Sequence, residues 1–182
     1  HYTDGIGQPK VDSARATLNR INPATIIDPV RERVAGDRLD ELVAQADVVI
    51  DGSDNFATRH AVNRACVNHR RPLVSGAAVR FDGQVAVFDS RQPGSPCYEC
   101  LFPEAGEFEE VRCAVMGVFA PLVGIIGSMQ AAEALKVLAG VGEPLVGRLQ
   151  LLDARTMQWR SIRVSKDPAC SVCAKAEVAV GV

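Results

Sequence analysis

The chain has 182 residues, 47% of them hydrophobic, and a formal net charge of −2. This length suits one domain with a substantial core, so we expect a single domain over residues 1–182. The near-neutral charge, without a long run of like charges, argues against a general nucleic-acid or membrane-surface binder. The first residue is His1 rather than Met, and we expect the chain to be truncated at its N-terminus.

Helix and strand signals alternate along the first half of the chain, as in an α/β fold. Apolar residues at steps of three and four predict a helix over residues 9–21, with Pro9 in its first turn. The continuous apolar run Val48–Ile50 is typical of a buried parallel strand. The other expected elements are a strand over 24–30, a short helix around 39–43, a helix over 55–68 and a strand over 73–75.

The second half adds antiparallel features. Another strand is expected within residues 79–88, with Asp82-Gly83 as a turn, and residues 149–152 and 159–164 read as a β-hairpin. The predicted fold is therefore a Rossmann-like, mostly parallel sheet with a C-terminal antiparallel extension.

Residues 113–132 form a segment without a charged side chain, and its length is about that needed to cross a bilayer. The helical pattern nevertheless continues through Glu133 and Lys136 and ends at Gly140. We therefore predict a buried core helix that also serves a subunit interface, and not a membrane span.

Two acids follow the apolar strand, in the sequence Asp51-Gly52-Ser53-Asp54. In open parallel sheets, ligands bind beyond the carboxyl ends of the strands. Asp54 could hold a magnesium ion on nucleotide phosphates, and Asn55 could cap a helix whose backbone N–H groups face an anion. Arg59, one turn later, could face the same site. The alternative is that both acids serve only as turn and capping residues.

Two Cys-x-x-Cys pairs, Cys97/Cys100 and Cys170/Cys173, are separated by 69 residues. Four sulfur ligands favour a closed, structural zinc site, because a catalytic zinc usually keeps one position for water. Two disulfides, or dithiols with redox roles, are the alternatives. The zinc reading predicts that the C-terminal end is tied to the middle of the chain.

Several motifs together resemble the ThiF/MoeB/HesA family, the bacterial relatives of ubiquitin-activating enzymes. In chain order they are Gly7-Gln8-Pro9-Lys10, Asp51 to Arg59, Ser75 to Ala78, the first cysteine pair, Gly117 to Lys136 and the second cysteine pair. The resemblance implies an ATP-dependent adenylyltransferase that activates the C-terminal glycine of a ubiquitin-like sulfur carrier. MoaD-type carriers serve molybdopterin synthesis and ThiS-type carriers serve thiamine synthesis. It also implies a cytoplasmic homodimer.

The family's functional positions carry over where the motifs match. Lys10 resembles the lysine that contacts ATP phosphates, and Asp54 resembles the aspartate that binds magnesium. Asn55 and Arg59 belong to the same motif as Asp54. The four paired cysteines match the zinc ligands. The family's Gly-rich ATP loop, with the acidic residue that follows it, is absent from the chain as given.

Cys113 resembles the cysteine that forms a covalent sulfur link to the carrier in ThiF-type enzymes, and nearby Arg112 could lower the pKa of its thiol. A small buried hydrophobe is the alternative. Cys66 is expected in the core, and the three histidines are left as surface or unassigned residues.

Two other functions stay open: a nicotinamide-dependent oxidoreductase with a structural zinc, and a non-catalytic binding fragment.

Overall fold

The computed structural model describes residues 3–106 and 117–174. The chain forms two compact units, residues 1–34 and 35–182, and each unit is described by itself. The expectation of a single domain stays a prediction.

The first unit consists of a short 3₁₀ helix, η1 (Thr3–Gly5), and the helix α1 (Lys10–Ile21), followed by irregular chain. The helix confirms the apolar periodicity, with Pro9 as its N-cap residue. Arg31 forms an ion pair with Asp12 of α1 at 2.7 Å, which holds the following segment against the helix. The strand expected over residues 24–30 is wrong. A strand must pair its backbone groups, and no sheet partner for this segment lies among the described residues.

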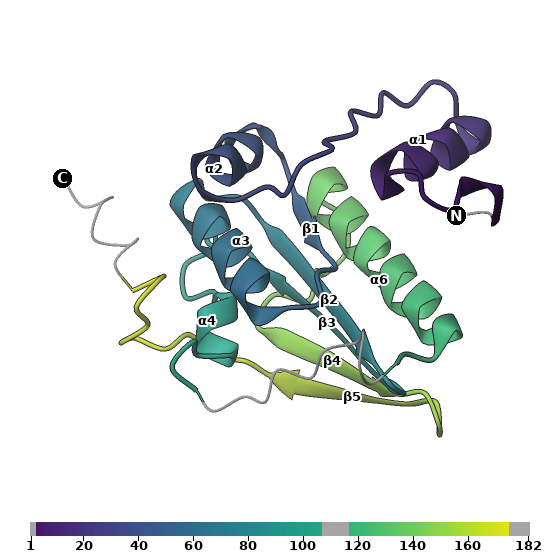
Figure 1. Cartoon of the computed structure of the whole chain (residues 1–182). Helices are drawn as coiled ribbons and strands as arrows, with labels where there is room; N and C mark the ends of the chain where they lie inside the picture. Colours follow the sequence, from purple (N-terminus) through teal and green to yellow (C-terminus); the bar gives the residue numbers. More distant parts are fainter. Residues whose placement is uncertain (1–2, 107–116, 175–182) are drawn as a thin grey trace. The chain divides into compact units, whose positions relative to one another are not determined.

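The second unit contains a five-stranded sheet in the order β1-β2-β3-β4-β5 (Figure 1). The strands are β1 (Val49–Asp51), β2 (Leu73–Val79), β3 (Asp82–Phe88), β4 (Arg148–Asp153) and β5 (Gln158–Arg163). β1 and β2 are parallel, whereas the other three neighbouring pairs are antiparallel. The α/β class is confirmed with a mixed sheet. Its antiparallel part is larger than predicted among the described strands, because tight turns join β2 to β3 and β4 to β5.

The turn between β2 and β3 lies at Arg80-Phe81, not at Asp82-Gly83 as expected. Val79 pairs with Asp82, so the turn has two residues, and Arg80 takes a φ of 50°. Gly83 lies within β3 because helix α6 packs on it. A Cβ at Gly83 would lie 2.7 Å from Cδ1 of Ile126, which is closer than packing allows.

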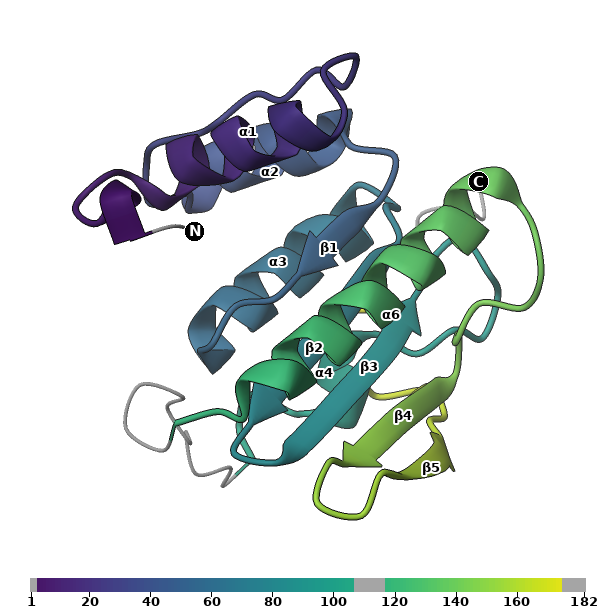
Figure 2. The same ribbon diagram turned by 90° about the vertical axis from the view of Figure 1, so that its right-hand side faces the viewer.

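Helices cover both faces of the sheet. In Figures 1 and 2, α6 (Ala120–Ala139) lies on one face, while α2 (Gly36–Gln45) and α3 (Phe56–Asn68) lie on the other. The alternation of β2 agrees: Leu73 packs with residues of α2 and α3, and its neighbour Val74 packs with residues of α6. The short helix α4 (Tyr98–Leu101) joins the α3 side, since buried Tyr98 belongs to that core.

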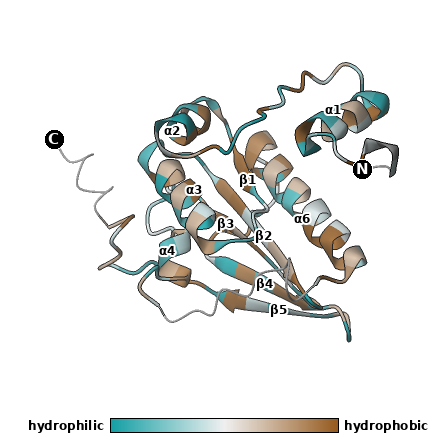
Figure 3. Cartoon of the chain, viewed as in Figure 1, coloured by the Kyte–Doolittle hydropathy of each residue, from teal (hydrophilic) through white to brown (hydrophobic). Residues whose placement is uncertain are grey.

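Helix α6 confirms the predicted apolar helix and ends at Gly140 as expected. It is long and apolar enough to cross a membrane by length and composition, and Figure 3 shows hydrophobic residues at both of its ends with more polar ones between. Its inward face, however, carries the buried polar residues Gln130 and Glu133 beside Leu122 and Ile126. These side chains bond to the rest of the unit, so the inward face of α6 belongs to the core. The expected burial of the helix is confirmed only in part, because 28% of its apolar window is buried within the chain.

Candidate functional site

The loop that joins β1 to α3 carries the acidic motif, at the carboxyl end of a parallel strand. Asp51, the last residue of β1, is buried, and its Oδ1 accepts a hydrogen bond from the Ser53 backbone N–H at 2.8 Å. Such a bond shapes a tight Asx turn. The next acid, Asp54, follows this turn and is exposed.

Helix α3 starts directly after Asp54. Asn55 is its N-cap residue, in an extended conformation, and the side-chain Oδ1 accepts from the Thr58 N–H at 2.8 Å. The capping role predicted for Asn55 is confirmed. The N-terminal end of this helix offers further backbone N–H groups beside the Asp54 carboxylate. One turn of chain therefore presents both a carboxylate, which could hold a cation, and backbone N–H groups, which could hold an anion.

Arg59 turns back onto the same loop. Its Nε and Nη2 donate to the Ser53 carbonyl oxygen at 3.1 and 2.6 Å, and the residue is 9% exposed. The guanidinium thus holds the loop at the Ser53 carbonyl. It also lies beside the Tyr98 phenol, whose pKa burial raises despite the opposing effect of Arg59.

A hollow of about 270 Å³ lies over this loop. The loop residues Gly52 to Asp54, together with Arg59, form one wall. The carboxyl half of β2, Gly76 to Ala78, forms the floor, and α6 supplies the opposite wall from Val123 to Gln130. Asp54, the candidate magnesium ligand, is one of its lining residues and, within residues 3–106 and 117–174, makes only a long 3.4 Å contact to the Asn55 amide. Its carboxylate is therefore available to a ligand.

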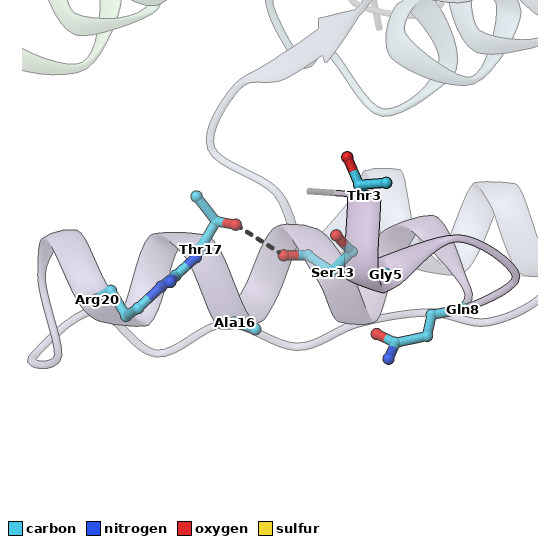
Figure 4. Close-up of a pocket in the computed structure, with 7 residues that line it drawn as sticks. All are labelled: Thr3, Gly5, Gln8, Ser13, Ala16, Thr17 and Arg20. Carbon is cyan, nitrogen blue, oxygen red and sulfur yellow. Dashed lines mark hydrogen bonds between the residues drawn. The ribbon is translucent and has the colours of Figure 1, made fainter. Parts of the chain in front are cut away.

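The structure brings Asp54, Asn55 and Arg59 together in the second unit. Lys10 is the first residue of α1 in the first unit and is exposed there. A hollow of about 710 Å³ accompanies α1, and Figure 4 shows its lining residues from η1, from α1 and, with Gln8, from the turn between them. Among the lining residues whose side chains the structure describes, none carries a carboxylate, and Lys10 is not one of them. The smaller hollow is the better candidate site because it combines the Asp54 carboxylate with the carboxyl end of a parallel strand.

The four paired cysteines meet as the spacing predicts. Their Sγ atoms all lie within 4.8 Å of one another, with Cys97–Cys170 at 3.7 Å and Cys100–Cys173 at 3.5 Å. Disulfide sulfurs are about 2.05 Å apart, so these four are free thiols. Zn–S bonds of about 2.3 Å in a tetrahedron place sulfurs about 3.8 Å apart. The cluster fits zinc.

Hydrogen-bond donors surround the sulfurs, as they do in structural metal sites. The N–H groups of Asp167 and Cys173 each approach a sulfur at 3.5 Å, and the Asn63 side-chain amide donates to Cys97 Sγ at 3.7 Å. The Cys97 thiol lies within hydrogen-bond distance of the Cys100 sulfur. This hydrogen bond lowers the pKa of the Cys100 thiol and raises the pKa of the Cys97 thiol. The Cys100 thiol therefore loses its proton more readily than the Cys97 thiol, and a bound dication would displace the protons of the cluster.

Three buried polar residues were missed by the sequence reading. His60 of α3, which the sequence left as surface or unassigned, is buried at 3% exposure. Its Nδ1 lies 3.0 Å from a carboxylate oxygen of Glu99. Asn63 accepts from the Tyr98 N–H at 2.9 Å, and Gln130 of α6 is 6% exposed. For Asn63 the available signal was the four-residue step from the N-cap residue Asn55 through Arg59 to Asn63, which places polar side chains on one face of α3.

The other two cysteines differ. Cys66 is in the core as expected, and burial, with a smaller effect of Asp51, raises the pKa of its thiol to about 12. Such a thiol is not a nucleophile near neutral pH. Cys113, the candidate for a covalent link, lies outside the described residues.

These features define an α/β protein with two separate centres: an open acidic site at the end of a parallel strand, and a closed cluster of four thiols. A model of the ThiF family matches residues 1–172. The chain belongs to the ThiF family, which confirms the resemblance noted in the sequence.

Named relatives agree with this assignment. The molybdopterin-synthase adenylyltransferase of Escherichia coli K12 is 46% identical over 173 residues, which cover 95% of this chain and 69% of that protein. The sulfur carrier protein ThiS adenylyltransferase of the same organism is 39% identical over 171 residues, covering 94% and 67%. A sulfur carrier protein adenylyltransferase of Thermus thermophilus is 43% identical over 177 residues, covering 95% and 65%.

Solved structures show the same fold. The crystal structure of E. coli MccB with MccA-N7isoASN has a TM-score of 0.79 at 20% identity, over 95% of this chain and 53% of that one. E. coli MccB with ATP has a TM-score of 0.76 at 19% identity, over 96% and 54%. The chain therefore spans about two thirds of the length of these curated relatives and about half of the MccB chain.

Proposed function

We propose that this chain, as part of its whole protein, adenylates the C-terminal glycine of a ubiquitin-like sulfur carrier of the MoaD or ThiS type. The observation that carries the proposal is the exposed Asp54 carboxylate at the rim of a hollow, beside the capped N-terminus of α3. Family membership and relatives named as adenylyltransferases of molybdopterin synthase and of ThiS support it. We also propose that the enzyme is cytoplasmic and acts in molybdopterin or thiamine synthesis.

The reaction joins two anions. A carboxylate oxygen of the carrier attacks the α-phosphorus of ATP; the new O–P bond forms as the bond to pyrophosphate breaks, and the bond electrons leave with pyrophosphate. A C-terminal carboxyl is already ionised near neutral pH, with a reference pKa of about 3.3–3.7, so no general base is required. The task of the protein is to offset repulsion between negative charges.

Four residues divide this task. We propose that Lys10 contacts the ATP phosphates and that Asp54 holds magnesium, which supplies positive charge at the phosphates when bound. Asn55 keeps the first turn of α3 formed, so its backbone N–H groups face the anion. Arg59 holds the Asp54 loop through the Ser53 carbonyl. Zinc bound by Cys97, Cys100, Cys170 and Cys173 would fix structure only, since four protein ligands leave no open position.

The decisive experiment is ATP–pyrophosphate exchange by the full-length protein, with a MoaD-type carrier, a ThiS-type carrier and no carrier. We expect exchange with one carrier, loss of exchange when its terminal glycine is deleted, and a carrier mass increased by one adenylate. No exchange with either carrier, in protein that is folded and contains zinc, would contradict the proposal. The pair of carriers also decides between the two pathways.

We further propose that the enzyme is a homodimer joined through α6. Several apolar side chains of this helix are exposed, including Val123 and Leu135 at 49% and 64%. A Cβ at Gly124 or Gly127 would meet nothing within 4 Å, so their backbone is open to close approach. Light scattering should give twice the chain mass, and Leu135→Glu should shift it to the monomer.

For Cys113 we propose the covalent link to the carrier. A carrier adduct trapped in the wild type and absent in Cys113→Ser would support it, and an adduct that survives the substitution would contradict it.

A further inference from the structure

Gln130 is an uncharged polar residue in the middle of the apolar face of α6. It is 6% exposed, and Leu122, Ile126 and Ala134 precede and follow it on the face that packs against the sheet. An amide buried without hydrogen-bond partners destabilises the folded protein. A leucine would fill this position without that cost, so the amide requires a reason.

The amide group of Gln130 bonds to both parallel strands. Its Nε2 donates to the Asp51 carbonyl oxygen at 2.8 Å and to the Val74 carbonyl oxygen at 3.2 Å. Asp51 is the last residue of β1, and Val74 lies in β2 next to the pairing partner of Asp51. One side chain of α6 therefore fixes the point at which β1 leaves the sheet.

The strand beneath makes room for this side chain. A Cβ built at Gly76 would lie 2.3 Å from Cδ of Gln130 and 2.5 Å from its Oε1. Any larger residue would displace the amide, because the contacting group is the functional end of the side chain. Gly76 and Gln130 thus form one contact between α6 and β2.

The fixed point controls the acidic loop. From Asp51 the loop continues through the Asp51–Ser53 hydrogen bond to the Ser53 carbonyl, which Arg59 holds, and then to Asp54. Gln130 and Asp54 line the same hollow. The carbonyl that Gln130 holds is three residues before the proposed magnesium ligand.

We propose that Gln130 is a positioning residue of the adenylation site: it acts through the Asp51 carbonyl to hold Asp54 where magnesium-bound ATP needs it. The expected effect on kcat rests on the proposed function, whereas the expected effect on the loop rests only on the hydrogen bonds of Gln130. A misplacement of about 1 Å in a reacting group lowers a rate by roughly 10²-fold, so a loosened loop reduces kcat.

Two variants separate the hydrogen bond from volume. Gln130→Met keeps similar volume and loses the donor. Gln130→Glu keeps the shape but places an acceptor against two carbonyl oxygens, unless the carboxyl is protonated and donates its O–H. The matched control is Glu133→Gln, also buried on α6, which holds the Leu145 N–H on a different loop.

The first measurement is amide hydrogen exchange of the full-length protein. In Gln130→Met we expect faster exchange at Ser53 and Thr58, whose N–H groups are bonded within the loop, with little change in β4 and β5. Glu133→Gln should leave these two amides unchanged. Unchanged loop protection in folded Gln130→Met would overturn the inference, whatever the activity.

The second measurement is ATP–pyrophosphate exchange. Gln130→Met should lower kcat by about 10²-fold, with a smaller change in the KM for carrier, whereas Glu133→Gln should keep the wild-type kcat. Gly76→Ala should lower kcat too, and the double variant should be no worse than the lower single one, because both act on one contact. Additive losses would contradict a shared contact.

The pH profile gives a third readout and covers the case that Gln130→Met fails to fold. The activity of Gln130→Glu relative to wild type should rise as the pH falls from 8 to 6, since protonation restores a donor. A ratio independent of pH would overturn the inference. If wild type shows no exchange but the loop loosens in Gln130→Met or Gln130→Glu, the proposed function fails while the positioning contact stands.

Discussion

The acidic loop and the cysteine cluster are both attached to α3, yet they are built for opposite tasks. At the N-terminus of the helix, Asn55 and Arg59 hold the loop and leave the Asp54 carboxylate exposed. One turn further, His60 contacts Glu99 and Asn63 contacts Cys97 and the Tyr98 N–H. The cluster offers four sulfurs, three of them from buried cysteines, and no place for a substrate.

This difference shows what distinguishes a reacting centre from a structural one: whether coordination positions stay open for a substrate. An open site with one exposed carboxylate can accept magnesium together with phosphate oxygens. A closed site with four sulfurs is complete without substrate. The two centres should therefore fail in different ways, and four substitutions test this.

The largest expected effect is on the open site. Asp54→Asn should lower carrier-dependent ATP–pyrophosphate exchange by at least about 10²-fold, the loss typical of removing one group that stabilises a transition state. Zinc content and melting temperature should stay at wild-type values, because Asp54 is exposed. Asp47→Asn, an exposed acid just before β1, is the control and should retain activity. Near-normal exchange in Asp54→Asn would remove Asp54 from the mechanism.

Loss of a cysteine ligand should lower zinc content and stability more than it lowers exchange activity. Cys97→Ser should reduce zinc from about one per chain to a small fraction and lower stability by on the order of 3 kcal/mol. For a chain of this size, that corresponds to roughly 6–12 °C in melting temperature. Metal analysis and calorimetry measure both. If exchange per folded, zinc-depleted molecule fell as far as in Asp54→Asn, the division between the centres would be wrong.

A smaller effect is expected at Asn63, where α3 meets the cluster. Asn63→Asp keeps the acceptor for the Tyr98 N–H but replaces the amide donor at Cys97 Sγ with a negative charge. Zinc affinity should fall by about 10–100-fold, as for other residues that support metal ligands. A competition titration with a chelator measures this. Asn68→Asp, exposed at the end of the same helix, should bind zinc normally.

The smallest effect is expected at the cap of α3. Asn55→Ala removes the side-chain acceptor for the Thr58 N–H and should cost about 1 kcal/mol, or roughly 2–4 °C, measured without ATP. Asn55→Asp retains an acceptor and should melt near the wild-type temperature. Equal losses in both variants would show that the amide group of Asn55 has a role other than capping.

Much of this arrangement is predictable from local patterns. The spacing of apolar residues located α1, the uncharged stretch of residues 113–132 located α6, and the Cys-x-x-Cys pairs located the cluster, because each signal is local in the sequence. Asn55 was predictable as a cap for the same reason. The strand expected over residues 24–30 failed because pairing depends on a partner that propensity does not specify.

Contacts between distant segments could not be predicted. Asp82-Gly83 is typical of a hairpin turn, but the glycine is required where α6 approaches β3. Similarly, Gln130 and Asp51 are 79 residues apart in sequence, and nothing local at either position indicates a hydrogen bond between them. His60 and Asn63 were missed because their partners belong to α4, and a buried polar residue has a recognisable role only once its partner is known.

The separation of the two cysteine pairs also has a consequence for synthesis of the chain. Cys97 and Cys100 leave the ribosome about 70 residues before Cys170, which at about 5–20 residues per second is on the order of 4–14 s. During that interval the first pair has only half of a zinc coordination sphere. The metal site can close only after β5 has been translated, so zinc capture marks the moment when the whole sheet is available to fold.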